Sequence, residues 1–179
     1  IELKKALESV NAGNNILEVG SGEAMIPMAF ALQFPEKFKM LNYIGFDFAY
    51  NRTFNAQSLF KFPINGIQFD NTFFYNGDAK VICHDDNSFD VVYSSRVLEQ
   101  IKYGKDKALS EMARVGKYLV LIEPVADFQN IYSRQHLKKQ DYINLKISDI
   151  ARHGEIIKVK KLNVYDPSYI DAIVVLKCS

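Results

Sequence analysis

The sequence predicts an α/β fold: a doubly wound mixed sheet of about seven strands, mostly parallel, with one antiparallel strand near the C-terminal edge. Two patterns predict it. Short apolar runs alternate with longer helical patterns, which is typical of parallel strands joined by helices. Two strand-like runs then follow each other closely near the end, as in an antiparallel pair. The length of 179 residues favours a single domain over 1–179.

The first half of the chain supplies three strands and their connecting helices. Leu3, Leu7 and Val10 recur at helical spacing, and an apolar run over 16–19 stops at a glycine turn like a buried strand. Prolines mark helix boundaries after 25–34 and after 50–62, because proline cannot continue a helix. The expected elements are helices over 2–10, 25–34 and 50–62 and strands over 16–19, 43–46 and 72–75.

The second half continues the alternation and then changes to paired strands. An apolar run over 118–122 is typical of a strand covered on both faces. Leu145, Ile147 and Ile150 indicate a late helix. The expected elements are strands over 89–93 and 118–122, helical segments over 97–101, 107–115 and 142–152, and strands over 156–163 and 172–177.

Composition excludes several classes of protein. Twenty-two Lys and Arg against 21 Asp and Glu give a formal charge of +1, which is not the basic footprint of a nucleic-acid binder. The longest apolar run, 24–32, contains a proline and is far shorter than the roughly 20 residues of a membrane-spanning helix. Two cysteines without a metal or redox motif fit a reducing compartment, so we expect a cytoplasmic protein that does not bind membranes.

A glycine turn follows the first strand, in the sequence Leu17-Glu18-Val19-Gly20-Ser21-Gly22. Glycines at a strand-to-helix turn let the backbone approach a ligand closely. A dinucleotide site requires a third glycine where Met25 stands, and a phosphate-binding loop requires a Lys followed by Ser or Thr. The turn is therefore not predicted to bind nicotinamide or nucleoside triphosphate, and an ordinary tight turn stays open as the alternative.

Polar residues also mark the tips of the next three strands. Asp47, followed by Phe48, ends the second strand, and a carboxylate there can accept both hydroxyls of a ribose. Asp78 and Ala79 follow the third strand, where a carboxylate and a backbone N–H can read an adenine edge. Ser94 lies at the tip of the fourth strand. In an open α/β sheet these tips lie together at the carboxyl edge, where ligands bind.

Together these segments resemble the class I methyltransferases that use S-adenosylmethionine, in particular those acting on small molecules. The resemblance runs over 14–124 and includes the glycine turn, Asp47, Gly77-Asp78-Ala79 and the fourth-strand segment 88–94. It implies a Rossmann-like sheet, S-adenosylmethionine as cofactor and a small-molecule methyl acceptor. The family's third glycine is replaced by Ala24. The implied cofactor-binding residues are Glu18, Gly20, Ser21, Gly22, Asp47, Phe48, Asp78, Ala79 and Ser94.

The sequence leaves the chemistry of the acceptor open. A protein or RNA acceptor, or a cofactor-binding scaffold without turnover, stays as an alternative, and the oligomeric state is undetermined. No catalytic residue is assigned; Glu123, Tyr132 and His136 are candidate bases because they follow the fifth strand. No His, Cys and Asp cluster has the spacing of metal ligands, so no metal is expected.

Overall fold

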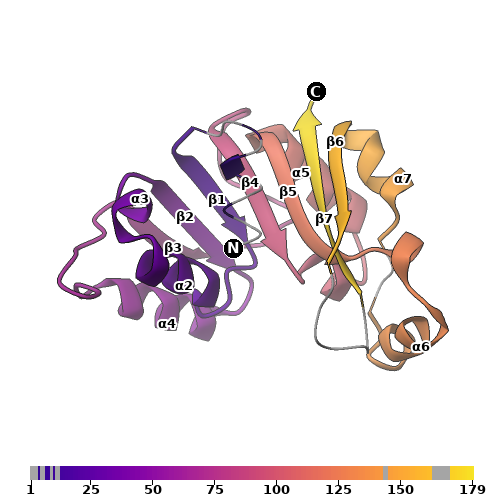
Figure 1. Cartoon of the computed structure of the whole chain (residues 1–179), viewed down its shortest axis with the longest axis horizontal. Helices are drawn as coiled ribbons and strands as arrows, with labels where there is room; N and C mark the ends of the chain where they lie inside the picture. Colours follow the sequence, from indigo (N-terminus) through magenta and orange to yellow (C-terminus); the bar gives the residue numbers. More distant parts are fainter. Residues whose placement is uncertain (1–3, 5–6, 9, 11–12, 143–144, 163–169) are drawn as a thin grey trace.

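The computed structural model describes residues 4, 7–8, 10, 13–142, 145–162 and 170–179, and they fold around one seven-stranded sheet (Figure 1). The strand order is β3-β2-β1-β4-β5-β7-β6. The strands are β1 (Asn15–Val19), β2 (Asn42–Asp47), β3 (Thr72–Asn76), β4 (Phe89–Ser95), β5 (Gly116–Pro124), β6 (Gly154–Lys161) and β7 (Asp171–Cys178). The expected strands are all present, while residue 163 of the last-but-one lies outside the described residues.

Strand direction confirms the mixed sheet. Strands β1 to β5 pair in parallel, and β7 pairs antiparallel with both β5 and β6. In Figure 1 the β7 arrow runs upward, against β4 and β5. The order reverses at β1, with β2 and β3 on one side and β4 and β5 on the other, so a crevice is expected at the carboxyl ends of β1 and β4.

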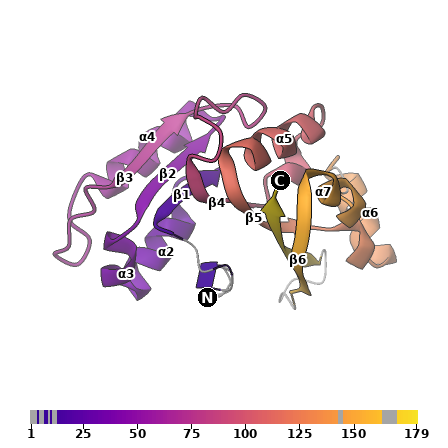
Figure 2. The same ribbon diagram turned by 90° about the horizontal axis from the view of Figure 1, so that it is seen from above.

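Helices cover both faces of the sheet, as Figure 2 shows for α2 and α3 on one side and α5 on the other. Residues of α2, α3 and α4 pack into one buried cluster, and residues of α5 and α7 pack into a second cluster across the sheet. The longer helices are α2 (Met25–Gln33), α3 (Pro35–Lys39), α4 (Tyr50–Phe60), α5 (Lys105–Val115), α6 (Ile131–Lys139) and α7 (Ile147–Ile150).

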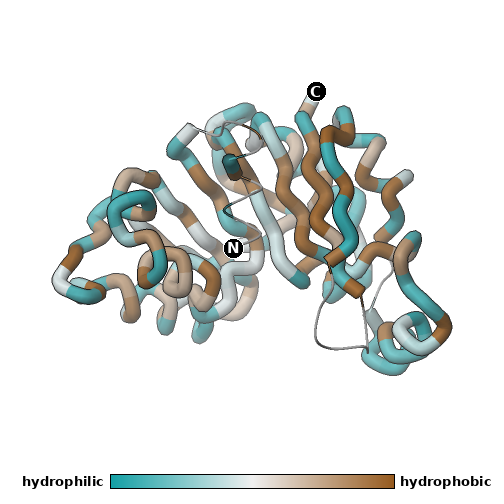
Figure 3. Tube along the Cα trace, viewed as in Figure 1, coloured by the Kyte–Doolittle hydropathy of each residue, from teal (hydrophilic) through white to brown (hydrophobic). Residues whose placement is uncertain are grey.

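The core follows the hydropathy of the strands. In Figure 3 the brown, hydrophobic colour concentrates on β4, β5 and β7, whereas the edge strand β6 is largely teal. Leu119, Val120 and Leu121 of β5 are fully buried, consistent with a strand covered on both faces. Within the described part of the chain, no helix has the length and apolar character needed to cross a membrane.

Two helix predictions are wrong in extent. The segment 97–101 contains only a short 3-10 turn, η1 (Leu98–Gln100). The predicted helix over 142–152 shrinks to α7 and a 3-10 turn, while α6 lies earlier in the chain. Leu145, read as part of a helical face, pairs instead with Val125 in an isolated parallel bridge. Most of the helix expected over 2–10 lies outside the described residues.

Candidate functional site

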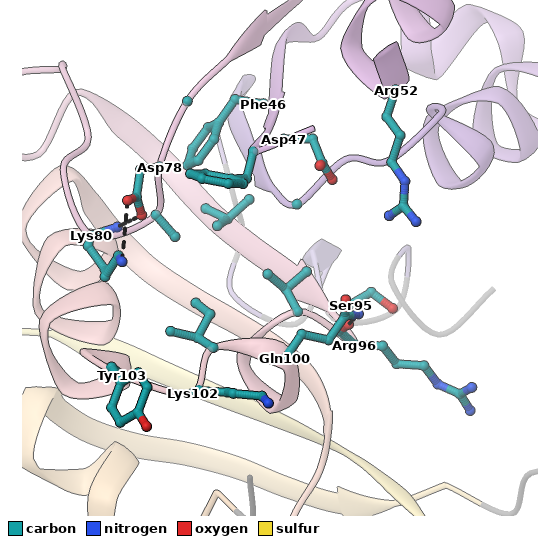
Figure 4. A pocket seen from close by; sticks show the side chains of 17 residues that line it. Phe46, Asp47, Arg52, Asp78, Lys80, Ser95, Arg96, Gln100, Lys102 and Tyr103 are labelled. Carbon is teal, nitrogen blue, oxygen red and sulfur yellow. Dashed lines mark hydrogen bonds and ion pairs between the residues drawn. The ribbon is translucent and has the colours of Figure 1, made fainter. Parts of the chain in front are cut away.

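A cavity of about 640 Å³ opens at the point where the strand order reverses. Its size lies within the range of small-molecule sites, roughly 300–1,000 Å³. Of the four residues at strand tips that were expected to converge, Gly20, Asp47 and Asp78 line it and Ser94 does not. Figure 4 shows Asp78 and Lys80 at one end and Ser95 and Arg96 at the other, with Asp47 between. The lining residues are Val19, Gly20, Phe46, Asp47, Phe48, Arg52, Gly77, Asp78, Ala79, Lys80, Ser95, Arg96, Val97, Gln100, Ile101, Lys102 and Tyr103.

The turn after β1 needs its first glycine. Gly20 has φ +72°, and a Cβ at this position would come within 2.2 Å of Val97 Cγ2. Its N–H donates to the Phe46 carbonyl at 2.8 Å, which ties the turn to the tip of β2. Gly22, with φ +54°, has no atom within 4 Å of such a Cβ. Ala24 keeps a left-handed backbone with φ 61°, so the alanine adopts a conformation that glycine usually supplies.

Asp47 is held rigidly at the centre of the cavity. Its Oδ2 accepts a hydrogen bond from the Gly22 N–H at 3.0 Å, and its Oδ1 accepts from the Ala49 N–H at 2.9 Å. Each carboxylate oxygen can accept a further hydrogen bond. The side chain is therefore fixed in orientation and still able to bind two hydroxyls. Phe48 beside it is exposed and forms part of the rim.

Asp78 and Ala79 form the end of the cavity near β3. Asp78 Oδ1 accepts from the Lys80 N–H at 2.9 Å, and Lys80 Nζ lies 3.4 Å from Asp78 Oδ2. Ala79 is buried, and Val97 and Ile101 line the same cavity. This end combines an apolar wall with a charged acceptor, as expected for a site that receives a heteroaromatic base.

Glu18 does not line the cavity, although the resemblance placed it in the site. It is 2% exposed, and its Oε2 accepts a hydrogen bond from the Tyr43 hydroxyl at 2.6 Å. The Tyr43 hydroxyl in turn contacts the Tyr93 hydroxyl. Burial raises the pKa of Glu18 to about 8. The carboxyl thus connects β1 to side chains of β2 and β4 in the core next to the glycine turn. Ser21 and Gly22 also lie outside the cavity lining, and the buried Oγ of Ser21 has no hydrogen-bond partner among the described residues.

Ser94 is likewise directed away from the cavity. It is 0% exposed, and its hydroxyl donates to Glu123 Oε1 at 2.8 Å. Strand β4 extends to Ser95, and successive side chains of a strand point to opposite faces, so Ser95 lines the cavity in place of Ser94. Glu123 also accepts from the Val97 N–H at 3.1 Å. Burial raises the pKa of Glu123 to about 7, and its contacts place it as a support of the β4 tip.

Several lining residues were not anticipated from the sequence. Arg96 has a left-handed backbone with φ 57°, and its guanidinium bonds Asp171 Oδ2 through Nε at 2.9 Å and Nη2 at 2.7 Å. Arg52 comes from the first turn of α4, and Tyr103, 86% exposed, lies at the rim. Only Arg52 follows a readable signal, because it stands five residues after Asp47 in a predicted helix. Tyr132 and His136 of α6 do not line this cavity.

Comparison with known proteins identifies the family. A family model described as "Methyltransferase domain" matches residues 17–119, more than half of the chain, and the chain therefore belongs to that family. The match confirms the resemblance to class I S-adenosylmethionine-dependent methyltransferases, and the chain is an enzyme of this class. A search of curated protein sequences finds no match.

Solved structures share the fold over nearly the whole chain. The N-methyltransferase NodS of Bradyrhizobium japonicum, solved with S-adenosyl-L-homocysteine, has a TM-score of 0.76 at 11% identity, covering 99% of this chain and 84% of its own. Geranyl diphosphate C-methyltransferase of Streptomyces coelicolor has a TM-score of 0.75 at 8% identity, covering 99% of this chain and 77% of its own. The YcgJ protein of Bacillus subtilis gives 0.70 at 16% identity, covering 99% and 98%. At these identities the likeness shows the fold alone.

Proposed function

We propose that this chain, as a single domain, binds S-adenosylmethionine in the cavity and transfers its methyl group to a small-molecule acceptor. The main supporting observation is the Asp47 carboxylate at the point where the strand order reverses. Two backbone N–H groups fix its orientation, and it can still accept hydrogen bonds from hydroxyl groups. The residues present fit the cofactor: Asp47 would hold the ribose, Asp78 and Ala79 the adenine edge, and the Gly20 turn the part of the ligand nearest β1.

The cofactor supplies a methyl group made electrophilic by a positively charged sulfur. The residues of the chain contribute mainly alignment, which is worth roughly 7–11 kcal/mol for well-oriented reactants. The turn at Gly20 donates to the Phe46 carbonyl of β2, and Asp47 at the end of β2 accepts from Gly22 of that turn. The turn and the carboxylate therefore keep a fixed position relative to each other. A cavity with both a charged and an apolar end suits an adenosine-containing ligand.

A small-molecule acceptor is supported by composition and by one structural relative. The near-neutral charge of +1 gives no basic footprint for RNA. Geranyl diphosphate C-methyltransferase is named for a small-molecule acceptor. The low cysteine count and two free thiols, Cys83 and Cys178, support placement in the reducing cytoplasm.

Calorimetric titration with S-adenosyl-L-homocysteine tests the cofactor assignment. Asp47→Asn and Asp78→Asn should each weaken binding by about 1–3 kcal/mol, the scale for a lost buried polar contact. Asp70→Asn is the matched control, because Asp70 is exposed and does not line the cavity. Wild-type affinity in both site variants would refute the assignment.

The acceptor class is tested with the wild-type protein and methyl-labelled S-adenosylmethionine. A cell extract is separated by size before the reaction. Label that appears in the small-molecule fraction supports the proposal. Label confined to protein or RNA would favour a macromolecular acceptor, and binding without any transfer would favour a scaffold.

A further inference from the structure

Exposed apolar side chains gather at the carboxyl edge of the sheet, on both sides of the cavity. Helices α4 and α6 begin soon after β2 and β5 end, so their first turns lie at this edge. In Figure 1 the two helices lie at the lower left and the lower right of the molecule. Among the described residues, the large apolar side chains exposed at this edge are Met25, Phe48, Tyr50, Phe54, Tyr103, Ile131 and Tyr132. A group of such residues around one opening marks a surface that binds another molecule.

Helix α4 presents an aromatic pair at this edge. Tyr50 and Phe54 are one turn apart, 66% and 60% exposed, and their rings stack with centroids 6.3 Å apart. Phe48, just before the helix, is 79% exposed and lines the rim of the cavity. Tyr50 and Phe54 do not line the cavity, so a ligand bound inside it would not cover them.

Helix α6 presents a second apolar group. Ile131 and Tyr132, in its first turn, are 72% and 79% exposed, whereas Leu137 of the same helix is buried. An ion pair between Lys102 of the cavity lining and Asp141, just after α6, holds the end of this helix beside the rim. Apolar groups on α4 and α6 therefore flank the mouth of the cavity.

The charges of both helices complement an anionic surface. Neither helix contains an acidic residue. Their cationic residues, outside histidine, are Arg52, Arg134, Lys138 and Lys139. Two acids beside the helices are engaged within the protein, because Glu23 accepts from Asn55 Nδ2 and Asp127 accepts from the Ile147 N–H. Exposed aromatic and aliphatic side chains combined with cations are typical of helices that lie on anionic membranes.

We propose that the carboxyl edge of the sheet docks on an anionic lipid surface through α4 and α6, with the mouth of the cavity facing the bilayer. Such docking is peripheral and needs no membrane-spanning helix. It replaces the expectation, drawn from composition, that the protein does not bind membranes. Composition averages charge over the whole chain to +1, whereas these two helices carry cations without acids. The proposal does not depend on which ligand the cavity holds.

Sedimentation of the full chain with lipid vesicles tests the docking. One set of vesicles contains phosphatidylcholine and phosphatidylglycerol in equal parts, and the other contains phosphatidylcholine alone. The wild-type protein should sediment with the anionic vesicles and much less with the neutral ones. Raising the salt concentration should release it, because salt screens the attraction between the cations and the lipid.

A pair of double variants tests the apolar contribution. Tyr50→Gln with Phe54→Gln should lower the partition coefficient on anionic vesicles roughly ten-fold or more, because two apolar rings no longer enter the interface. The matched control is Leu32→Gln with Met40→Gln, since both side chains are exposed near the opposite edge of the sheet. The control should bind vesicles as the wild type does. Both variants should keep the wild-type urea midpoint, because every substituted side chain is exposed.

A second pair tests the charge. Lys138→Gln with Lys139→Gln should weaken binding to anionic vesicles about ten- to thirty-fold, the scale for two lysines near such a surface. Lys39→Gln with Lys177→Gln removes the same charge from exposed positions near the opposite edge and should change little. A wild-type protein that stays in solution with both kinds of vesicle would overturn the proposal and leave the apolar groups to a protein partner. Equal binding to both kinds of vesicle, or equal losses in the control variants, would also overturn it.

Discussion

Replacing Glu18 by glutamine should make the protein less sensitive to alkaline pH. Glu18 is buried beside the glycine turn and accepts a hydrogen bond from Tyr43. Burial raises the pKa of its carboxyl from 4.5 to about 8. The folded protein therefore holds a proton on Glu18 over a pH range in which the unfolded chain has released it. Glutamine keeps a carbonyl that can accept from Tyr43 and carries no titratable proton.

The size of the effect follows from linkage between protonation and folding. The pKa of Glu18 is higher in the folded protein than in the unfolded chain. The contribution of protonated Glu18 to the free energy of unfolding is therefore complete below pH 4.5 and is lost as the pH rises to about 8. One pKa unit is equivalent to about 1.4 kcal/mol, so the whole range corresponds to roughly 5 kcal/mol. Other titrating groups are common to wild type and variant and cancel in the difference.

Urea unfolding of the ligand-free protein at about pH 5, 7 and 9 measures this difference. The free energy of unfolding of Glu18→Gln, relative to wild type, should rise by several kcal/mol between the lowest and highest pH. Glu155→Gln is the control, because Glu155 is exposed on β6 and its variant should follow the wild type throughout. Parallel curves for wild type and Glu18→Gln would refute a buried, protonated carboxyl at this position.

Two further substitutions test the framework around the cavity. Gly20→Ala should lower the free energy of unfolding by at least about 2 kcal/mol and weaken S-adenosyl-L-homocysteine binding, because the added Cβ brings left-handed backbone strain and a close contact with Val97. Gly22→Ala should lower it by only about 1 kcal/mol, because a Cβ there meets no neighbouring atom. Equal urea midpoints for the two variants would contradict this reasoning. Arg114→Lys should lower the free energy of unfolding by about 1–3 kcal/mol in the same urea assay, because lysine cannot form the paired hydrogen bonds of the guanidinium. The control Arg134→Lys, at an exposed position, should change it very little. The fork of Arg114 contacts Glu111, Asp86 and the carbonyls of Ile82 and His84.

The fold could be predicted because its signals are local. Each parallel strand is a short apolar run ended by a turn, and each early helix is bounded by proline or by a turn. Helix α6 was missed because it has few apolar residues and hence a weak period. Its readable signal was Asn130, whose side chain accepts from the Ser133 N–H at 2.9 Å as an N-cap. The apolar residue Leu145 was misassigned because its isolated bridge is to Val125, which lies far from it in the sequence, just after β5.

The residues of the candidate site also differ in whether a local sequence signal could identify them. Gly20, Asp47 and Asp78 could be found because strand tips in a parallel sheet meet at one edge whatever the details of packing. Ser94 and Ser95 could not be distinguished, because a difference of one residue in the end of β4 reverses which side chain faces the cavity. Arg96 and Tyr103 depend on the path of the chain after β4, where the helix predicted over 97–101 is only a short 3-10 turn.

Two buried carboxyls near the cavity link neighbouring strands of the sheet. Glu18 of β1 contacts a tyrosine of β2 whose hydroxyl meets one from β4, and Glu123 of β5 binds Ser94 and the Val97 N–H at the tip of β4. Both carboxyls have pKa values raised by burial, so each costs stability that an apolar residue would not cost. Their hydrogen bonds supply order: Glu18 fixes side chains of β1, β2 and β4 relative to one another in the core, and Glu123 fixes the end of β4 against β5. A reaction whose rate depends on alignment of two bound molecules benefits from such a fixed edge. The cost in stability at Glu18 and Glu123 is therefore consistent with a site that works by holding its ligands still.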